Sequence, residues 1–259
     1  MLYTKFHRRD QIAVQDLVAM YELFRSYYDY APMDVFLSDI EKKSGAFLIR
    51  SKSTHQLVGF STLAIYQLQL NGKNVKGLFS GDTIIKKEYW GSRSLQVAFT
   101  WKVIWEALKN PFTQQYWLLI SKGYKTYLLM SRNFQEFYPR KDAGAKDKRL
   151  KPLIIDYCEK LFPGRLDHTS MLLDFGEEAN RLKSGVAEID GTLHANEPDV
   201  LFFEQCNPSW RLGTELPCIA RADLASLLKL VPRYFLKVSG LFANQNDRVH
   251  KGKTAKAVR

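Results

Sequence analysis

The hydrophobic pattern of the N-terminal part of the chain changes from helical to extended spacing. After Asp10, a residue suited to an N-cap, apolar side chains recur at the spacing of an amphipathic helix, namely at Val14, Leu17, Val18, Tyr21, Phe24 and Tyr28. A second short helix is expected after Pro32. The period then becomes two, so residues 46–51 and 57–70 are predicted to be strands joined by a polar turn at 52–56.

A hairpin and a crossover are predicted next. Asn71 and Gly72 favour a tight hairpin turn, since both central positions of that turn need positive φ. The return strand, residues 75–86, completes a three-stranded antiparallel meander. Residues 95–109 have helical spacing but are apolar on nearly every side, which predicts a buried helix. The continuous apolar run at 116–120 then predicts a strand covered on both faces, parallel to the strand before the helix.

The remaining pattern predicts more elements and no repeat. Together the elements predict an α/β fold in which helices flank a mixed, mostly antiparallel sheet with a central parallel strand pair. The later segments are a helix at 123–138, an exposed basic loop at 140–151, a helix at 153–162, a strand at 199–205, a closing helix at 222–237 and a disordered basic tail from 245.

Charge and composition narrow the class of partner. The 259 residues include 38 Lys and Arg against 27 Asp and Glu, a net charge of +11. This balance favours an anionic partner or substrate: nucleic acid, an acidic carrier protein or a phosphorylated cofactor. No apolar run is long enough for a membrane-spanning helix and no signal-peptide pattern is present, so a cytoplasmic protein is expected. The five histidines lack ligand spacing, so no metal is expected.

The junction after residue 83 carries the clearest candidate site. A strand runs into a short loop and then into a helix, and free N–H groups at a helix N-terminus suit the phosphate of CoA or of phosphopantetheine. Alternatively, Gly91 and Ser92 only cap the helix. The candidate binding residues are Ile84, Ile85, Lys86, Trp90, Gly91, Ser92, Arg93 and Ser94.

This order of elements, over residues 17–138, resembles the GNAT acyltransferase superfamily. In that family the junction reads Arg or Gln, two residues, Gly, one residue, then Gly or Ala, often after a Tyr. Here Tyr89 matches the aromatic residue, Trp90 stands at the Arg or Gln position and Gly91 follows it. Arg93 and Leu95 replace the two small residues, which places a side chain where the backbone would approach the phosphates.

The resemblance implies an enzyme whose acyl thioester lies between two splaying central strands. In layout the chain is most similar to the long-chain N-acyl amino acid synthases. That branch implies acyl-CoA or the phosphopantetheine of an acyl carrier protein as donor, and an amino acid, peptide or small metabolite amine as acceptor. Bulky apolar residues in the predicted pocket elements suit an acyl chain or a plain core: Phe60, Tyr66, Leu78, Phe79, Trp101, Trp117, Tyr124 and Tyr127.

The resemblance also implies roles for single residues. Asp82 lies on the strand before the junction, where the family often places a carboxylate that deprotonates the incoming ammonium; alternatively it binds N–H groups at a sheet bulge. The backbone of Ile84, Ile85 and Lys86 would hold the pantetheine amides. Ser121, Tyr124 and Tyr127 are candidate proton donors to the thiolate, although tyrosines at such positions are core residues by default.

These inferences divide the chain into an acyltransferase-like core at 1–138, a C-terminal region at 139–245 that completes the sheet and the acceptor side, and a basic tail at 246–259. Two alternatives stay open. One is a non-catalytic module of the same fold that binds nucleic acid or another anion, although the aromatic residues fall in apolar elements rather than among exposed basic residues. The other is an acyl-homoserine lactone type synthase, which would need S-adenosylmethionine.

Overall fold

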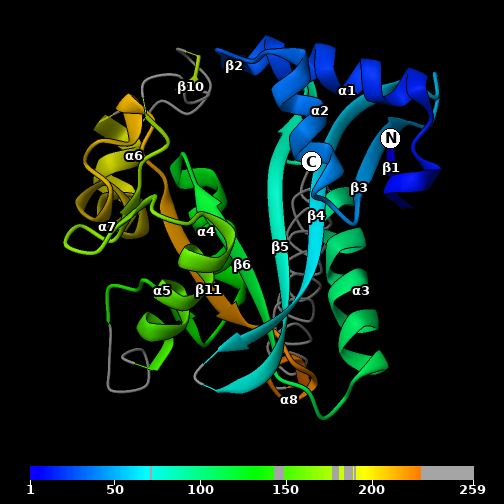
Figure 1. Cartoon of the computed structure of the whole chain (residues 1–259). Helices are drawn as coiled ribbons and strands as arrows, with labels where there is room; N and C mark the ends of the chain where they lie inside the picture. Colours follow the sequence, from blue (N-terminus) through cyan, green and yellow to red (C-terminus); the bar gives the residue numbers. More distant parts are fainter. Residues whose placement is uncertain (71, 143–148, 177–180, 184–188, 190, 229–259) are drawn as a thin grey trace, which may run out of the picture.

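A seven-stranded sheet forms the centre of the computed structural model, which describes residues 1–70, 72–142, 149–176, 181–183, 189 and 191–228 (Figure 1). The strands, in sheet order, are β1 (Leu2–Arg8), β3 (Gly45–Ser51), β4 (Leu57–Leu70), β5 (Lys73–Ile85), β6 (Gln115–Ser121), β11 (Leu216–Arg221) and β7 (Phe137–Tyr138). Only the β5–β6 pair is parallel among these neighbours. The predicted fold class, a mostly antiparallel mixed sheet with a parallel pair flanked by helices, is confirmed.

Helices cover both faces of this sheet. On one face α1 (Val14–Tyr27) and α2 (Met33–Glu41) share a core with inward residues of β3 and β4, and α5 (Leu150–Leu161) covers the other end of β4 and β5. On the opposite face α3 (Ser94–Lys109), α4 (Tyr124–Asn133) and α7 (Pro198–Cys206) share a second core. The alternation of a strand explains this division, since Phe47 belongs to the α3 core and Leu48 to the α1–α2 core.

Short elements connect these layers. They are β2 (Tyr28–Asp29), β8 (Leu166–Asp167), β9 (Leu172–Leu173), β10 (Arg181–Leu182), α6 (Gly191–Asn196), α8 (Leu224–Leu228) and the 3₁₀ turns η1 (Arg9–Gln11), η2 (Lys87–Tyr89) and η4 (Trp210–Leu212). The β2 strand continues directly from α1 and pairs with β10, so a segment from the second half of the chain lies beside the N-terminal helices.

The local predictions of the meander are confirmed. The β3, β4 and β5 strands are consecutive antiparallel neighbours, and Leu70 pairs with Lys73 across the turn. Gly72 has a φ of +72°, the left-handed region that its lack of a Cβ permits. Asn71, the other half of the predicted turn, lies outside the described residues.

Several predicted elements are wrong. Residues 2–8, for which no strand was predicted, form edge strand β1. The first helix, expected to be capped at Asp10, is capped at Ala13, while Asp10 pairs with Arg8 at 2.6 Å. The helix expected over 123–138 ends at Asn133. The strand expected at 199–205 is helix α7, whose first residue is a proline, as suits the first turn of a helix. In each case the tertiary surroundings override a local pattern.

Other predictions fall partly outside the described residues. Within the basic loop expected at 140–151, residues 143–148 are not described, and α5 already begins at Leu150. Of the closing helix expected at 222–237, the structure describes α8 and no residue after Leu228. The tail from 245 also lies outside the described residues.

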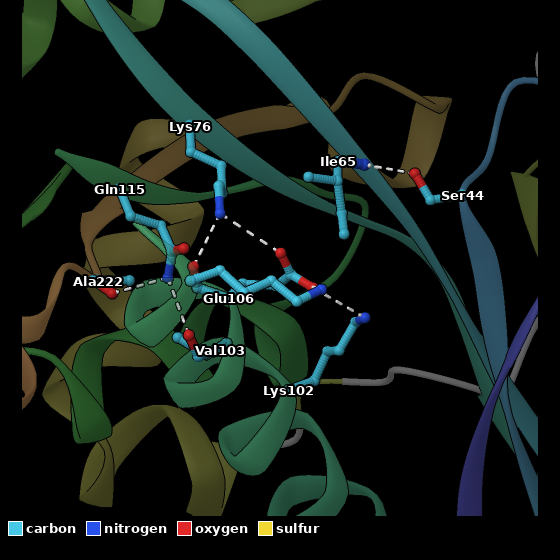
Figure 2. Close-up of polar contacts among 9 residues, drawn as sticks. Ser44, Ile65, Lys76, Lys102, Val103, Glu106, Gln115 and Ala222 are labelled. Carbon is cyan, nitrogen blue, oxygen red and sulfur yellow. Dashed lines mark hydrogen bonds and ion pairs between the residues drawn. The ribbon is translucent and has the colours of Figure 1, made fainter. Parts of the chain in front are cut away.

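A buried polar cluster anchors the C-terminal half of α3 to the sheet (Figure 2). Lys76 Nζ on β5 donates to the Glu106 carbonyl oxygen at 2.7 Å and forms an ion pair with its carboxylate at 3.4 Å. Gln115 Nε2 donates to the carbonyl oxygens of Val103 and Ala222, both at 3.0 Å. Burial alone would raise the pKa of Glu106, but hydrogen bonds from Lys109 and Lys102 hold that pKa below its usual value. The cluster therefore fixes the direction of α3 and leaves its N-terminus at the other end of β5.

Candidate active site

The two central strands separate in the middle of the sheet. Pairing between β5 and β6 ends at Ser80 and Leu119, where Trp117 Nε1 donates to Ser80 Oγ at 2.8 Å. On its other edge β5 remains paired with β4 as far as Ile85, with a register shift between Ser61 and Leu63. The splay implied by the resemblance is thus present. Beyond Ser80 the edge of β5 that faces β6 pairs with none of the described strands.

A glycine is required at this bulge. A Cβ added to Gly81 would lie 2.4 Å from Thr62 Oγ1 and 3.3 Å from Lys43 Cε. Thr62 is fully buried, so its side chain cannot move aside without disturbing the core. The bulge brings the next residue, Asp82, to the mouth of the splay.

A cavity of about 1050 Å³ opens from the splayed strands. Its walls come from β5 after the splay, from the end of β6 with the start of α4, and from α1, β2 and α2. One wall is aromatic: Phe79, Phe162 and Phe175 stand in a row with ring centroids 5.7 and 5.5 Å apart. The cavity is large enough for an elongated ligand and combines an apolar wall with a charged one.

The cavity lining holds eight charged side chains, four acidic and four basic. We call five of them the acid–base cluster: Asp39 of α2 and Lys43 just after it, Asp82 of β5, Lys122 at the β6–α4 connection and Glu215 just before β11. Lys43 pairs with Asp39 at 2.8 Å and Lys122 with Glu215 at 3.4 Å. Three carboxylates against two ammonium groups give the cluster a net charge of −1 when all are ionised.

Asp82 has the protonation behaviour of a proton acceptor. Burial raises the pKa of Asp82, as does the nearby Asp39 carboxylate, while Lys122 and Lys43 oppose this rise. Burial also raises the pKa of Glu215, against the effect of Lys122. A carboxylate whose pKa lies above its usual value binds a proton more strongly than a free aspartate does, as a general base must.

Tyr28 supplies a protonated hydroxyl on the facing side of the cavity. Its side chain is buried, and Lys122 Nζ lies 5.2 Å from the ring centroid. Burial, followed by the charges of Asp82 and Glu215, raises the pKa of Tyr28 well above its usual value. This hydroxyl therefore remains protonated at neutral pH and is suited to donate a hydrogen bond.

The strand-to-helix junction lies between this cavity and a second one. Ile84, Ile85 and Trp90 line the large cavity, and the Trp90 indole donates to the Ile85 carbonyl oxygen at 2.8 Å. Arg93 and Ser94 line the second cavity, of about 590 Å³, on the β1 and β3 side. Lys86, Gly91 and Ser92 belong to neither lining; Gly91 has a φ of +88° in the turn into α3, and Ser92 Oγ donates to Ser94 Oγ at 3.4 Å.

The α3 N-terminus has the elements of an anion site. Its N-cap residue, Arg93, makes no side-chain cap hydrogen bond, and of the first-turn N–H groups that of Ser94 donates to Ser92 Oγ at 3.4 Å. Across the junction, Lys125 Nζ of α4 lies 3.5 Å from the Trp90 ring centroid. Burial and the nearby Lys87 lower the pKa of Lys125. Positive charge is therefore concentrated where the two helices begin.

The predicted proton donors lie elsewhere. Ser121 is fully buried and donates to the Gly123 carbonyl oxygen at 2.8 Å. Tyr127 donates to the Pro139 carbonyl oxygen at 3.1 Å inside an aromatic core, and burial raises its pKa. Tyr124 belongs to the same core, and the described cavity lining includes none of the three. Of the eight bulky residues expected to form a pocket only Phe79 lines the cavity, while Trp101 is exposed.

The sequence reasoning missed most of the acid–base cluster. Lys122 directly follows the predicted strand at 116–120, and this position at a strand end was a usable signal. Asp39 lies in the short helix after Pro32 and Lys43 follows its end, while Glu215 lies far along the chain. These residues meet only because β11 inserts beside β6 and α2 packs above the splay.

Comparisons with known proteins find similar solved structures but no matching family. No family model and no curated protein matches the chain. Among solved structures, a probable N-acyltransferase from Enterococcus faecalis V583 matches at 12% identity and a TM-score of 0.40, over 52% of this chain and 33% of that one. A GNAT-family N-acetyltransferase from Escherichia coli in complex with CoA matches at 9% identity and a TM-score of 0.37, over 52% and 69%. N-myristoyltransferase of Saccharomyces cerevisiae with bound myristoyl-CoA matches at 13% identity and a TM-score of 0.34, over 57% and 40%.

Two further observations concern the described residues alone. None of their helices is both long and apolar enough to cross a lipid bilayer. Their His, Cys, Asp and Glu side chains form no group of three or more that could hold a metal ion.

Proposed function

We propose that this protein is an N-acyltransferase that moves an acyl group from a phosphopantetheine thioester, of CoA or of an acyl carrier protein, to an amine. The observation that carries the proposal is Asp82: a carboxylate of raised pKa at the mouth of the strand splay, inside a large cavity. Amide formation from a thioester needs a base for the ammonium, a polarised carbonyl and a proton for the thiolate. The cavity offers a group for each need.

The donor would lie along the open edge of β5. Beyond Ser80 this edge presents backbone N–H and C=O groups up to Ile85, which suit the amides of pantetheine. A backbone N–H at the bulge would polarise the thioester carbonyl. Phosphate groups would meet the first turn of α3, with Lys125 nearby. Arg93, the departure from the family pattern, would then contact phosphate through its guanidinium instead of leaving space for a close backbone approach.

The acceptor would lie in the acid–base cluster. Its three carboxylates offer hydrogen-bond acceptors to an ammonium group, and Asp82 accepts the proton that must leave before the nitrogen can attack. The C–N bond forms as the C–S bond breaks, and the nitrogen loses its second proton, which passes through the Tyr28 hydroxyl to the departing thiolate. Tyr28 is therefore unchanged at the end of the step, and Asp82 releases the first proton to solvent.

The apolar wall supports a donor with a long acyl chain. Phe79, Phe162 and Phe175 add an apolar surface to the cavity that begins beside Lys43, whose Nζ lies 5.3 Å from the Phe79 ring centroid, and an acetyl group would not fill this surface. We therefore propose a fatty acyl chain as the transferred group and an amino acid, peptide or small metabolite amine as acceptor, as in the long-chain N-acyl amino acid synthases. The acyl chain would contact the aromatic wall and the amine the charged wall.

Asp82→Asn tests the proposal. The purified full chain is incubated with thioesters from acetyl to palmitoyl and a panel of amines while free thiol is followed. A lost general base predicts a fall in kcat/KM of about 100-fold or more, with thermal unfolding nearly unchanged. Asp10→Asn, at the exposed Arg8 pair, is the matched control and should retain the wild-type rate. Equal rates for Asp82→Asn and wild type would remove Asp82 from the mechanism.

A further inference from the structure

The outer side of edge strand β1 presents backbone groups that can bind another strand. One side of β1 pairs with β3, and within the described part of the chain no strand pairs with its other side. The Lys52 N–H donates to the Met1 carbonyl oxygen and the Arg9 N–H to the Ser44 carbonyl oxygen, so the odd-numbered residues bond towards β3. The N–H and C=O groups of the even-numbered residues therefore point outward: Leu2, Thr4, Phe6 and Arg8.

The second cavity lies beside this edge. Contrary to the expectation of a buried helix, α3 exposes Val97 by 51% and Trp101 by 68%. The cavity of about 590 Å³ has these two side chains and Ala98 on one wall, and Thr4 and Phe6 of β1 on the other. Phe47, Arg93 and Ser94 complete its lining. An exposed tryptophan in a pocket next to a strand edge is typical of surfaces that bind an added strand and hold its alternate side chains.

A second copy of β1 satisfies this edge in one register. Residues directly opposite each other in an antiparallel pair have side chains on the same face, so the even-numbered residues of two copies can pair with one another. The Arg8 N–H already donates to Gln11 Oε1 at 3.2 Å, which leaves Leu2, Thr4 and Phe6. All three are paired only when Thr4 lies opposite the partner's Thr4 and Leu2 lies opposite the partner's Phe6.

The charges of β1 favour the same register. Tyr3, Lys5 and His7 share the face of β1 that points away from α3. With Thr4 at the symmetry axis, Lys5 lies opposite the partner's Tyr3. A shift by two residues would place Lys5 opposite the partner's Lys5, and like charges at directly opposite positions destabilise a strand pair.

The partner's Leu2 would enter the second cavity. In this register it lies opposite Phe6, which lines the cavity together with Trp101. It also lies on the α3 face of the sheet, because Leu2, Thr4 and Phe6 share one face of the strand. The two-fold symmetry repeats the contact, so each protomer covers the exposed tryptophan of the other.

We propose that this protein forms a symmetric dimer in which the two β1 strands pair antiparallel about Thr4 and each Leu2 enters the second cavity of the other protomer. The two seven-stranded sheets then form one continuous sheet, with both α3 helices on the same face. The edge complements itself in backbone groups, in charge and in apolar contact, and this selects a second copy rather than an unrelated peptide. The inference does not depend on the proposed enzymatic activity.

Trp101→Ser tests the cavity contact without touching the core. In analytical ultracentrifugation of the full chain, the mass should approach twice the 30.0 kDa of one chain as concentration rises. Trp101→Ser should weaken the dimer about tenfold or more, as expected for a tryptophan at the centre of an interface. The matched control is Trp105→Ser, one turn further along α3, which is 60% exposed and outside the cavity lining, and it should dimerise like wild type. A wild-type protein that stays monomeric, or equal effects of the two variants, would overturn the proposal.

Thr4→Cys tests the register. It places two thiols opposite each other with Cα atoms about 5.5 Å apart, a separation that a disulfide spans. Mild oxidation should yield a covalent dimer whose bond maps to position 4 by peptide mass spectrometry. The control His7→Cys, about 20 Å from its copy in this register, should give no more dimer than wild type. Equal yields from the two variants, or no covalent bond at position 4 in a protein that sediments as a dimer, would contradict the β1 pairing.

Discussion

At the scale of single residues, the protonation of Asp82 depends on groups from both halves of the chain. They are Asp39 of α2 and Lys43 just after it, Tyr28 of β2, Lys122 at the β6–α4 connection and Glu215 just before β11. The site is therefore a coupled system, and its apparent pKa values belong to the cluster.

This coupling predicts a pH effect of Glu215→Gln. Asp82 acts as a base only when deprotonated, and its raised pKa places the acid limb of kcat/KM above the usual aspartate value of 3.8. Removing the Glu215 charge removes a neighbour that favours the protonated form, so the acid limb should move to lower pH. A pH–rate profile with Glu204→Gln as surface control checks this. An unmoved or upward-shifted limb would show that Glu215 does not act on the base.

The bulge predicts a cost for Gly81→Ala. The new Cβ would meet Thr62 Oγ1 at 2.4 Å, so the strand must shift or the core must open, at about 1–3 kcal/mol. Chemical denaturation measures the loss, and Gly191→Ala, with open space around it, should be neutral. The double variant Gly81→Ala with Thr62→Ala should recover much of the stability. If Gly81→Ala is as stable as wild type, the close packing described for this bulge is wrong.

At the scale of elements, the anchor of α3 is a buried charge cluster rather than apolar packing alone. Lys76→Met removes the hydrogen bond to the Glu106 carbonyl oxygen and one ion pair of its carboxylate, which stays paired with Lys102 and Lys109, so it should cost about 1–3 kcal/mol of unfolding free energy. Lys73→Met, at the exposed start of β5, is the matched control and should change stability little. Urea denaturation measures the stability of both variants. Similar unfolding midpoints for Lys76→Met and Lys73→Met would contradict a stabilising role of the buried charge cluster.

Elements with strong local signals could be predicted from the sequence. The β3–β4–β5 meander was predicted correctly because its strands have a period of two and a turn residue, Gly72, marks the hairpin. The edge strand β1 alternates weakly because its side chains are mostly half-buried, and α7 is an apolar run too short to distinguish a helix from a strand. The α3 helix was predicted to be buried because its apolar residues fall on nearly every side, but Val97, Trp101, Trp105 and Leu108 are exposed.

Some residues of the candidate site could be predicted from the local sequence, and others are brought together only by the fold. Asp82 and the junction were predicted because they follow one another along a strand and loop. Lys122, Glu215, Lys43 and Tyr28 come together only through sheet order and helix packing, which no local pattern encodes. The proton donors predicted from the nearby sequence, Ser121 and Tyr127, are instead bound to backbone carbonyl groups.

At the scale of the whole molecule, the second half of the chain completes both the sheet and the cavity. The β11 strand lies between β6 and β7, and Phe162, Phe175 and Glu215 supply cavity walls that the first half lacks. A nucleic-acid or other anion-binding role would need no such cavity. The acyltransferase proposal uses the splay, the cavity and the cluster together.

The most direct test of this proposal follows both products of one reaction. The full chain is incubated with a long-chain acyl-CoA that is isotopically labelled in its acyl group and with a mixture of amines; free thiol and labelled amide are then measured by mass spectrometry. The account predicts equimolar thiol and acylated amine, both reduced about 100-fold or more in Asp82→Asn. Thiol release without any acylated amine, or no turnover together with salt-sensitive binding of polyanions, would contradict it.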